Sequence, residues 1–437
     1  MRSPFRSLLT SALTTYTGGG GGGGGSAHSK RCLSSLVSLQ EISIPAADGT
    51  IMAAQRWTKQ QPRQTPATTS KTTTDSENDE KSSESSSQKF DRRTILCTHG
   101  WLDNCGTHHY LAPRLALELE DGAEIIALDF PGHGHSSHRS KDAPPLVSAD
   151  LVYYTCEAIR ALQSPSFSFQ ASEEEEEKVN QPEDFPEKWT TDSASGSIVD
   201  TTSDNEKKKI TIVGHSLGAA VASLTAASFP EWIDQLVLLD AATFLPRQAT
   251  DTAEHVRQHI LKRQQHTNSQ DQQQQPPRVY PNLERAIQVR QFSATKMPGN
   301  QAMSHQAARA MVMRGTRKVV DSQQMEEEKK DEVETLDSMD DTGPVQFRHD
   351  PRFTWPSIQY MTWEQNEGIM AALHKTDIDV CLLQAESGWP VDDYITKRVK
   401  EILQPTFFRR LPGKHHFHAD PETAEAVGDA VIEFLKR

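Results

Sequence analysis

Residues 210–224 read ITIVGHSLGAAVASL, and this stretch decides the fold. Residues 210–213 form a continuous apolar run, which is typical of a strand buried on both faces. A G-x-S-x-G motif follows at 214–218, and small residues from Leu217 onward predict a helix. A turn this tight strains the backbone of Ser216 and presents its hydroxyl above the sheet, at the helix N-terminus. The motif therefore predicts a nucleophile elbow with Ser216 as the catalytic nucleophile.

Outward from this motif, short apolar runs alternate with helical patterns. Strands are predicted at 39–44, 50–57, 94–98, 124–128, 210–213, 236–239, 378–383 and 406–411, and helices at 108–119, 149–162, 217–229 and 421–435. This alternation predicts an α/β fold with a mostly parallel, doubly wound sheet of eight strands. Because active sites of such sheets lie at the carboxyl ends of the strands, the chemistry is expected there.

The composition predicts one folded domain diluted by polar segments. Only 35% of the 437 residues are hydrophobic, and the mean hydropathy is −0.63. A net charge of −14 argues against a nucleic-acid binder, which needs a basic face. Because no run of about 18 apolar residues occurs, no transmembrane segment is predicted. Five cysteines without tight spacing favour a reducing compartment over a disulfide scaffold.

Residues 38–437 are predicted to form a single domain. Low complexity and charge runs predict disordered insertions at about 59–90, 164–208, 263–278 and 320–345. Residues 1–37 lack Asp and Glu and contain a glycine run, so we expect a disordered N-terminus or a transit peptide. The expected location is intracellular: cytoplasmic, or in a mitochondrion or plastid if that segment is a transit peptide.

The loop after the 94–98 strand is the expected source of the oxyanion hole. Backbone N–H groups of Leu217 and Trp101 are predicted to form it, with Leu102 as the neighbouring possibility. Gly100 lets this backbone come close to the site. His99 resembles a catalytic base in type, but we expect it to bond the backbone of the loop.

A serine needs an adjacent base, and in this fold the histidine comes last along the chain. The sequence LPGKHHFH at 411–418 lies between the last predicted strand and helix. His415 is the first choice for the base and His416 the second. A His-x-x-His pair beside a third histidine also suits a metal, but further ligands are not obvious there, so no metal is predicted.

The carboxylate that orients the histidine is expected after the 378–383 strand. Asp392 is preferred, since its loop can fold back toward His415. Glu386 is the alternative acid, being nearer the strand end. Asp240, at the end of the 236–239 strand, is an outside option.

Together these motifs resemble the α/β-hydrolase family and, more narrowly, the serine hydrolase-like proteins of animals and other eukaryotes. The matching pieces are HGWLDN (99–104), LDFPGHGHSSH (128–138), GHSLG (214–218), LLDA (238–241), RGTRKV (314–319) and PGKH (412–415). The RGTRKV piece lies outside the catalytic core and favours the narrower family. The resemblance implies an α/β-hydrolase fold and a serine triad, in which Ser216 and His415 match by motif. The acid matches only loosely.

Residues 245–375 exceed what one crossover needs, and predicted helices at 256–263, 283–292 and 302–313 indicate a cap over the site. The predicted function is a serine hydrolase that cleaves small or medium acyl esters through an acyl-enzyme. Its partner is a small-molecule acyl substrate, and no cofactor is expected. The alternative is a non-catalytic or weakly catalytic ligand-binding protein on a hydrolase scaffold, because fold does not imply function.

Overall fold

The structure is a computed structural model, and it describes part of the chain. The described residues are 36–60, 93–119, 123–140, 143–164, 208–271, 278–319, 342–357 and 359–437, without the side chains of 266–271. Residues 1–35 of the predicted N-terminal segment lie outside these ranges. So do most of the predicted insertions at 59–90, 164–208 and 320–345, and residues 272–277 of the fourth.

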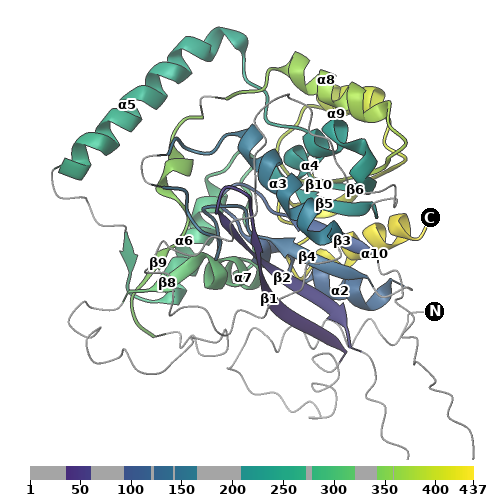
Figure 1. The fold of residues 1–437 in the computed structure, drawn as a ribbon, viewed down its shortest axis with the longest axis horizontal. Coiled ribbons are helices and arrows are strands. Elements are labelled where there is room, and N and C mark those ends of the chain that lie inside the picture. Colours follow the sequence, from purple (N-terminus) through teal and green to yellow (C-terminus); the bar gives the residue numbers. More distant parts are fainter. Residues whose placement is uncertain are drawn as a thin grey trace, which may run out of the picture.

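An eight-stranded sheet forms the centre of the molecule, with the order β1-β2-β4-β3-β5-β6-β10-β11 (Figure 1). Its strands are β1 (Val37–Pro45), β2 (Ile51–Lys59), β3 (Thr94–Thr98), β4 (Glu124–Leu128), β5 (Ile210–His215), β6 (Ile233–Leu239), β10 (Asp379–Ser387) and β11 (Phe407–Lys414). β1 pairs antiparallel with β2, and β2 antiparallel with β4. All pairs from β4 to β11 are parallel. The predicted mostly parallel sheet of eight strands is confirmed.

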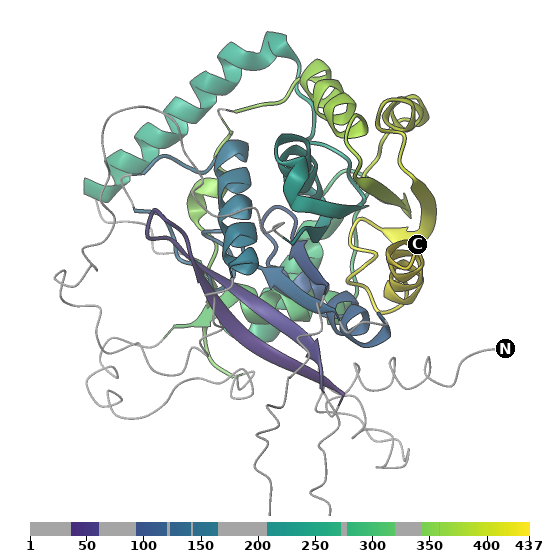
Figure 2. The same ribbon diagram turned by 45° about the vertical axis from the view of Figure 1, so that its right-hand side comes forward.

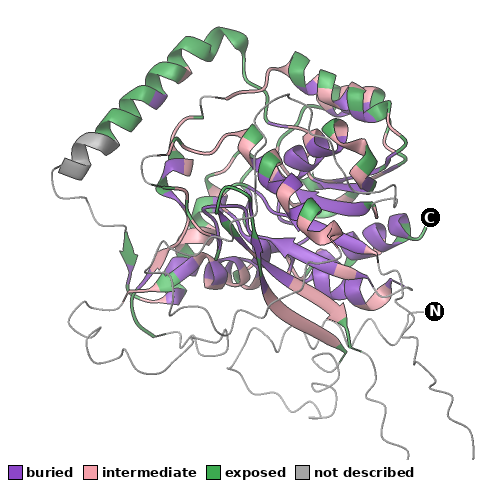
Figure 3. Cartoon of the chain, viewed as in Figure 1, coloured by how far each residue is buried: buried purple, intermediate pink, exposed green. Residues whose placement is uncertain are grey.

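Helices cover both faces of this sheet. α3 (Ser148–Gln163), α4 (Leu217–Ser228), α8 (Trp363–His374) and α9 (Asp393–Leu403) pack on one face, and α2 (Leu111–Glu118) and α10 (Ala424–Leu435) on the other. Successive residues of β5 point to opposite faces of the sheet. Ile212 therefore packs in the core under α3, α4, α8 and α9, and Val213 packs in the core under α2 and α10. Both side chains are fully buried, which explains the continuous apolar run in the sequence. Figure 3 shows that buried residues gather in the central strands and the helices beside them.

The segment between β6 and α8 forms a cap with a small core of its own. It contains α5 (Thr252–Asp271), β7 (Val279–Tyr280), α6 (Leu283–Thr295), α7 (His305–Gly315), β8 (Thr316–Lys318) and β9 (Val345–Phe347), together with short 3-10 helices at Ala249–Asp251 and Pro351–Thr354. Two further 3-10 helices, at Cys105–His108 and Pro230–Trp232, lie outside this segment. Strands β7, β9 and β8 form a second sheet. Met303 and Met311 pack in the cap core, whereas α5 extends along the outside with its apolar residues exposed (Figure 2).

The cap ends earlier than the predicted range of about 245–375. Met370 and Leu373 of α8 belong to the main core, where α8 packs against α4 and α9. The three helices predicted within the cap correspond to α5, α6 and α7. Across the described ranges, no helix combines the length and apolar character that crossing a membrane requires.

Arg314, at the end of α7, joins the cap to the central sheet. Its Nε donates to Asp129 Oδ2 at 2.8 Å, and its Nη1 donates to both oxygens of Glu41 on β1, at 2.8 and 3.0 Å. Asp129 is fully buried and also accepts from the backbone N–H groups of Cys105 and His135. Burial by itself raises the pKa of Asp129, but Arg314 and these N–H groups outweigh it and hold that pKa below its ordinary value.

We expect Arg314→Met to destabilise the protein by about 3–5 kcal/mol, because it leaves the Asp129 carboxylate buried without its cation. Chemical unfolding measured by circular dichroism checks this. Arg317→Met, at an exposed position on β8, is the matched control and should change the free energy of unfolding by less than about 0.5 kcal/mol. Equal effects of the two substitutions would contradict the structural role of Arg314.

Candidate active site

Ser216 occupies the turn between β5 and α4. Its backbone has φ 52° and ψ −118°, a conformation that costs a non-glycine residue free energy. β5 and α4 approach so closely that a Cβ at Gly214 would lie 2.6 Å from Ala219 Cα, and a Cβ at Gly218 would lie 2.5 Å from the carbonyl oxygen of Thr98 on β3. The structure thus has the strained turn that the motif predicts, and Ser216 remains partly accessible although His215 before it is fully buried.

His415 lies against Ser216. Its Nε2 is 2.8 Å from Ser216 Oγ, and its Nδ1 is 2.6 Å from Asp240 Oδ2. Because a carboxylate only accepts, Nδ1 carries the proton and Nε2 is free to accept from the serine hydroxyl. The structure therefore places His415, the first choice for the base, against Ser216. His416, the second choice, contacts Asp103 instead.

The structure corrects the predicted acid. Asp240, the outside option, holds His415, and its side chain is 6% exposed. Asp392 is exposed and accepts from the backbone N–H of Tyr394 at 2.8 Å, so it caps the N-terminus of α9. Glu386 is exposed on β10. Neither preferred carboxylate orients the histidine in this structure.

Asp240 reaches His415 because the sheet order places β6 beside β10. Its backbone adopts φ 55°, and its N–H donates to the carbonyl of Leu383 at 2.8 Å. The carboxylate accepts from the N–H groups of Ala385 at 2.9 Å and Trp389 at 3.1 Å. A Cβ at Gly388 would collide with this carboxylate, so the loop after β10 wraps Asp240 with backbone alone.

The predicted oxyanion donors flank Ser216. Leu217 is the first residue of α4, where a backbone N–H has no partner within the helix. On the other side, residues 100–103 form a turn in which the N–H of Asp103 donates to the carbonyl of Gly100 at 3.2 Å. A Cβ at Gly100 would lie 3.3 Å from Ser216 Cβ, so this turn adjoins the serine. The choice of Trp101 and Leu217 stays a prediction.

His99 behaves as expected for a loop residue. It is fully buried, its Nδ1 lies 2.8 Å from the carbonyl of Gly100, and its Nε2 accepts from the N–H of Phe130 at 3.0 Å. Both ring nitrogens are used on backbone groups. The predicted structural role of His99 is confirmed.

Gln301 of the cap is a site residue that the sequence did not reveal. It is fully buried, and its Oε1 accepts from the backbone N–H of His415 at 2.9 Å. Its Nε2 donates to the carbonyl of Gly388 at 2.8 Å. One cap side chain therefore joins the loop of His415 to the loop that wraps Asp240. A glutamine in a connecting segment carries no motif that would have singled it out.

A second cap side chain reaches the other flank of the site. Arg290 Nη2 on α6 donates to Asp103 Oδ1 at 2.6 Å, and His416 Nε2 lies 3.0 Å from Asp103 Oδ2. Burial by itself raises the pKa of Asp103, but His416 and Arg290 hold that pKa well below its ordinary value. Burial lowers the pKa of His416, so neutral His416 donates to the carboxylate.

Asp103, His215 and His416 also have the spacing of metal ligands. One ligand atom of each lies within 4.8 Å of the others, and His215 Nδ1 has no hydrogen-bond partner among the described residues. However, Arg290 Nη2 neutralises Asp103 and lies 3.4 Å from His416 Nε2. A cation at this point would meet the guanidinium, so these residues fit an ion pair better than a metal.

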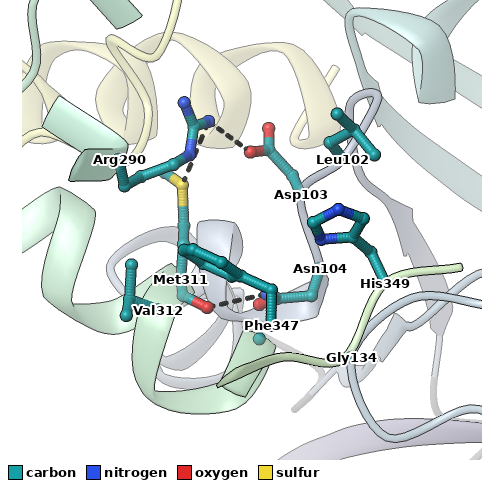
Figure 4. A pocket seen from close by; sticks show the side chains of 10 residues that line it. Leu102, Asp103, Asn104, Gly134, Arg290, Met311, Val312, Phe347 and His349 are labelled. Carbon is teal, nitrogen blue, oxygen red and sulfur yellow. Dashed lines mark hydrogen bonds and ion pairs between the residues drawn. The ribbon is translucent and has the colours of Figure 1, made fainter. Parts of the chain in front are cut away.

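A pocket of about 300 Å³, partly open to solvent, lies between the 100–103 turn and the cap (Figure 4). Its apolar walls are Leu102, Met311, Val312 and Phe347, its polar walls are Asp103, Asn104, Arg290 and His349, and Gly134 and Gly315 complete it. Leu102 and Asp103 belong to the turn that adjoins Ser216, so the pocket lies beside that turn, whereas Ser216, His415 and Asp240 do not line it.

A family model described as the alpha/beta hydrolase fold matches residues 93–420. The chain belongs to the α/β-hydrolase fold family. It is 25% identical over 350 residues to a "Serine hydrolase-like protein" of Danio rerio, which covers 79% of this chain and 82% of that protein. "Serine hydrolase-like protein 2" of Homo sapiens is 24% identical and covers 78% of this chain and 86% of its own length. The predicted resemblance to serine hydrolase-like proteins is confirmed.

Solved structures share the fold of this α/β hydrolase. The hypothetical protein PA1622 from Pseudomonas aeruginosa PAO1 superposes with a TM-score of 0.58 at 23% identity, covering 91% of this chain and 100% of that one. The thioesterase domain from the curacin biosynthetic pathway gives a TM-score of 0.55 at 14% identity, covering 92% and 100%.

Buried histidines of this α/β hydrolase predict acid sensitivity. Burial lowers the pKa of His133 to about 3, against about 6.5 in an unfolded chain. The unfolded state therefore binds the proton first as pH falls, and the stability present above about pH 6.5 is lost below it. We expect His133→Phe, which keeps a ring beside Phe353, to reduce the loss of unfolding free energy between pH 7 and pH 5 by about 2 kcal/mol.

Urea unfolding at the two pH values measures this difference. His374→Gln, at an exposed position on α8, is the control and should retain the full loss of the unaltered protein. If His133→Phe loses as much unfolding free energy between pH 7 and pH 5 as the unaltered protein, the prediction that His133 is buried in its neutral form is wrong.

Proposed function

We propose that this α/β hydrolase is a serine hydrolase that cleaves small or medium acyl esters through Ser216, His415 and Asp240. One observation carries the proposal: the contacts Ser216 Oγ to His415 Nε2 and His415 Nδ1 to Asp240 Oδ2, at 2.8 and 2.6 Å, form an unbroken relay. Nucleophile, base and orienting group stand in the order that acyl transfer requires.

In this mechanism the Ser216 hydroxyl attacks the ester carbonyl while His415 Nε2 takes its proton. Asp240 fixes the tautomer of His415 and stabilises the imidazolium that forms. The backbone N–H groups of Leu217 and Trp101 donate to the oxyanion of the tetrahedral intermediate, aided by the N-terminus of α4. His415 then gives its proton to the leaving alcohol, and the same residue activates the water that releases the acid from Ser216.

The ester class is supported by the pocket that begins at Leu102. Its apolar residues Met311, Val312 and Phe347 suit the acyl chain of an ester. Two solved structures with this fold are titled as a thioesterase domain and an esterase, and ester cleavage is proposed here for this chain by analogy with them.

The alternative is a ligand-binding protein without turnover, since fold does not imply function, and the ambiguous acid was one ground for it. Asp240 removes that ground, because its carboxylate is buried, accepts two backbone N–H groups and contacts His415. The catalytic reading is therefore favoured.

Fluorescent fluorophosphonate is expected to label the unaltered protein at Ser216. Labelling should disappear in Ser216→Ala and fall by about 10³-fold or more in rate in His415→Ala, since the serine then has no base. In-gel fluorescence measures it, with circular dichroism to show that each variant folds. A folded, unaltered protein that takes no label would favour the ligand-binding alternative.

Asp240→Asn should lower kcat for p-nitrophenyl butyrate by about 10³- to 10⁴-fold, because an amide holds the wrong tautomer of His415. Asp392→Asn and Glu386→Gln are matched controls, and each should keep kcat within about twofold. Loss of activity in Asp392→Asn with normal turnover in Asp240→Asn would restore the choice made from the sequence.

A further inference from the structure

We propose that Arg290 of the cap is a positioning residue for the oxyanion hole, acting through its ion pair with Asp103. This inference rests on the proposed function, since it assigns the 100–103 turn to oxyanion binding. It makes a cap side chain part of the apparatus that sets the reaction rate, although Arg290 itself touches no reacting atom.

The turn that Arg290 holds is strained. Leu102 adopts φ 57°, in the left-handed region, and the N–H of Asp103 closes the turn on the carbonyl of Gly100. A side chain in this region costs about 1–2 kcal/mol, so the turn needs an anchor. Trp101 precedes the strained residue and is 46% exposed, so its own side chain does not supply that anchor.

Asp103 supplies the anchor, and Arg290 fixes Asp103. The Asp103 side chain is 2% exposed and that of Arg290 is 12% exposed, so the contact at 2.6 Å is shielded from water. Arg290 Nη2 is aimed between Asp103 and Met311 Sδ, which lies 3.9 Å away (Figure 4). Shielded ion pairs of this kind are costly to break, because the carboxylate left behind has lost both water and its cation.

The same contact joins three parts of the site. Arg290 comes from α6, Asp103 from the turn after β3, and His416 from the loop that carries His415. Asn104 adds a second tie beside Asp103, since its Nδ2 donates to the carbonyl of Met311 on α7 at 2.7 Å. The cap thus holds the oxyanion turn at two adjacent residues.

Without the guanidinium, Asp103 keeps His416 as its one side-chain hydrogen-bond partner among the described residues. A buried carboxylate in that state turns toward water, and it carries the 100–103 backbone with it. A shift of about 1 Å in an oxyanion donor is enough to cost about 10²-fold in rate. Ser216 and Asp240 lie on other loops. His415 is next to His416 in the chain but is held independently, by Gln301 at its backbone N–H and by Asp240 at its Nδ1, so we expect the relay to keep its geometry.

The test is steady-state hydrolysis of p-nitrophenyl butyrate by Arg290→Met, with Arg285→Met as the matched control at an exposed position of the same helix. We expect Arg290→Met to lower kcat by about 10- to 100-fold with KM within about twofold, while the control stays near the unaltered protein. Arg290→Lys, which keeps the charge but not the planar fork, should be intermediate.

Two readouts separate positioning from other roles. The pH midpoint of kcat/KM should stay unchanged in Arg290→Met, because the base is untouched and only the plateau falls. Hydrogen exchange should become faster at the amides of 101–103 in Arg290→Met and not in Arg285→Met, with melting temperatures reported for both.

Normal kcat in Arg290→Met, an equal loss in Arg285→Met, a loss confined to KM, or a shifted pH midpoint would each overturn the proposal. If the unaltered protein neither turns over the ester nor takes fluorophosphonate, the proposed function fails. The exchange measurement then still decides whether Arg290 holds the turn, and unchanged exchange at 101–103 overturns it.

Discussion

Parallel strands bring their carboxyl ends to one edge of a sheet, and everything around Ser216 depends on that constraint. The 100–103 turn follows β3, Ser216 follows β5, Asp240 follows β6 and His415 follows β11. β10, which lies between β6 and β11, contributes backbone instead of a side chain, through the N–H groups that bind Asp240. The sheet order therefore determines which segments lie side by side, and the positive φ angles of Ser216 and Asp240 orient their side chains toward His415.

Polar groups of the cap reach three loops at this edge. Arg314 reaches Asp129, Arg290 reaches Asp103, and Gln301 reaches the backbone of His415. Buried ion pairs add little net stability, because removing the charges from water offsets most of their attraction. Here these contacts fix orientation, because each one holds a loop at the strand ends against a single position of the cap. We therefore regard the cap as part of the site's framework, in addition to any role in substrate choice.

Errors in the sequence-based picture have physical causes. Asp392 is the right residue type at a plausible strand end, but aspartate is also a favoured N-cap, and it caps a helix that went unrecognised, α9. The strands β7, β8 and β9 have two or three residues each, too few for a periodic pattern. No helix was predicted at 363–374, so the predicted cap range ran over α8, whose Met370 and Leu373 pack in the main core.

The sequence by itself determined the strands of the main sheet, Ser216 and His415. Each of these is encoded locally: a strand buried on both faces needs a continuous apolar run, a tight turn needs G-x-S-x-G, and the base follows the last strand. Only the tertiary structure decided that Asp240 contacts His415, that Gln301 joins the loops around these two residues, and that Arg290 pairs with Asp103. Those choices depend on the register of β6 beside β10, on positive φ angles at Asp240 and Leu102, and on the docking of a cap. Such contacts join residues far apart in the chain, so no pattern of neighbouring residues records them.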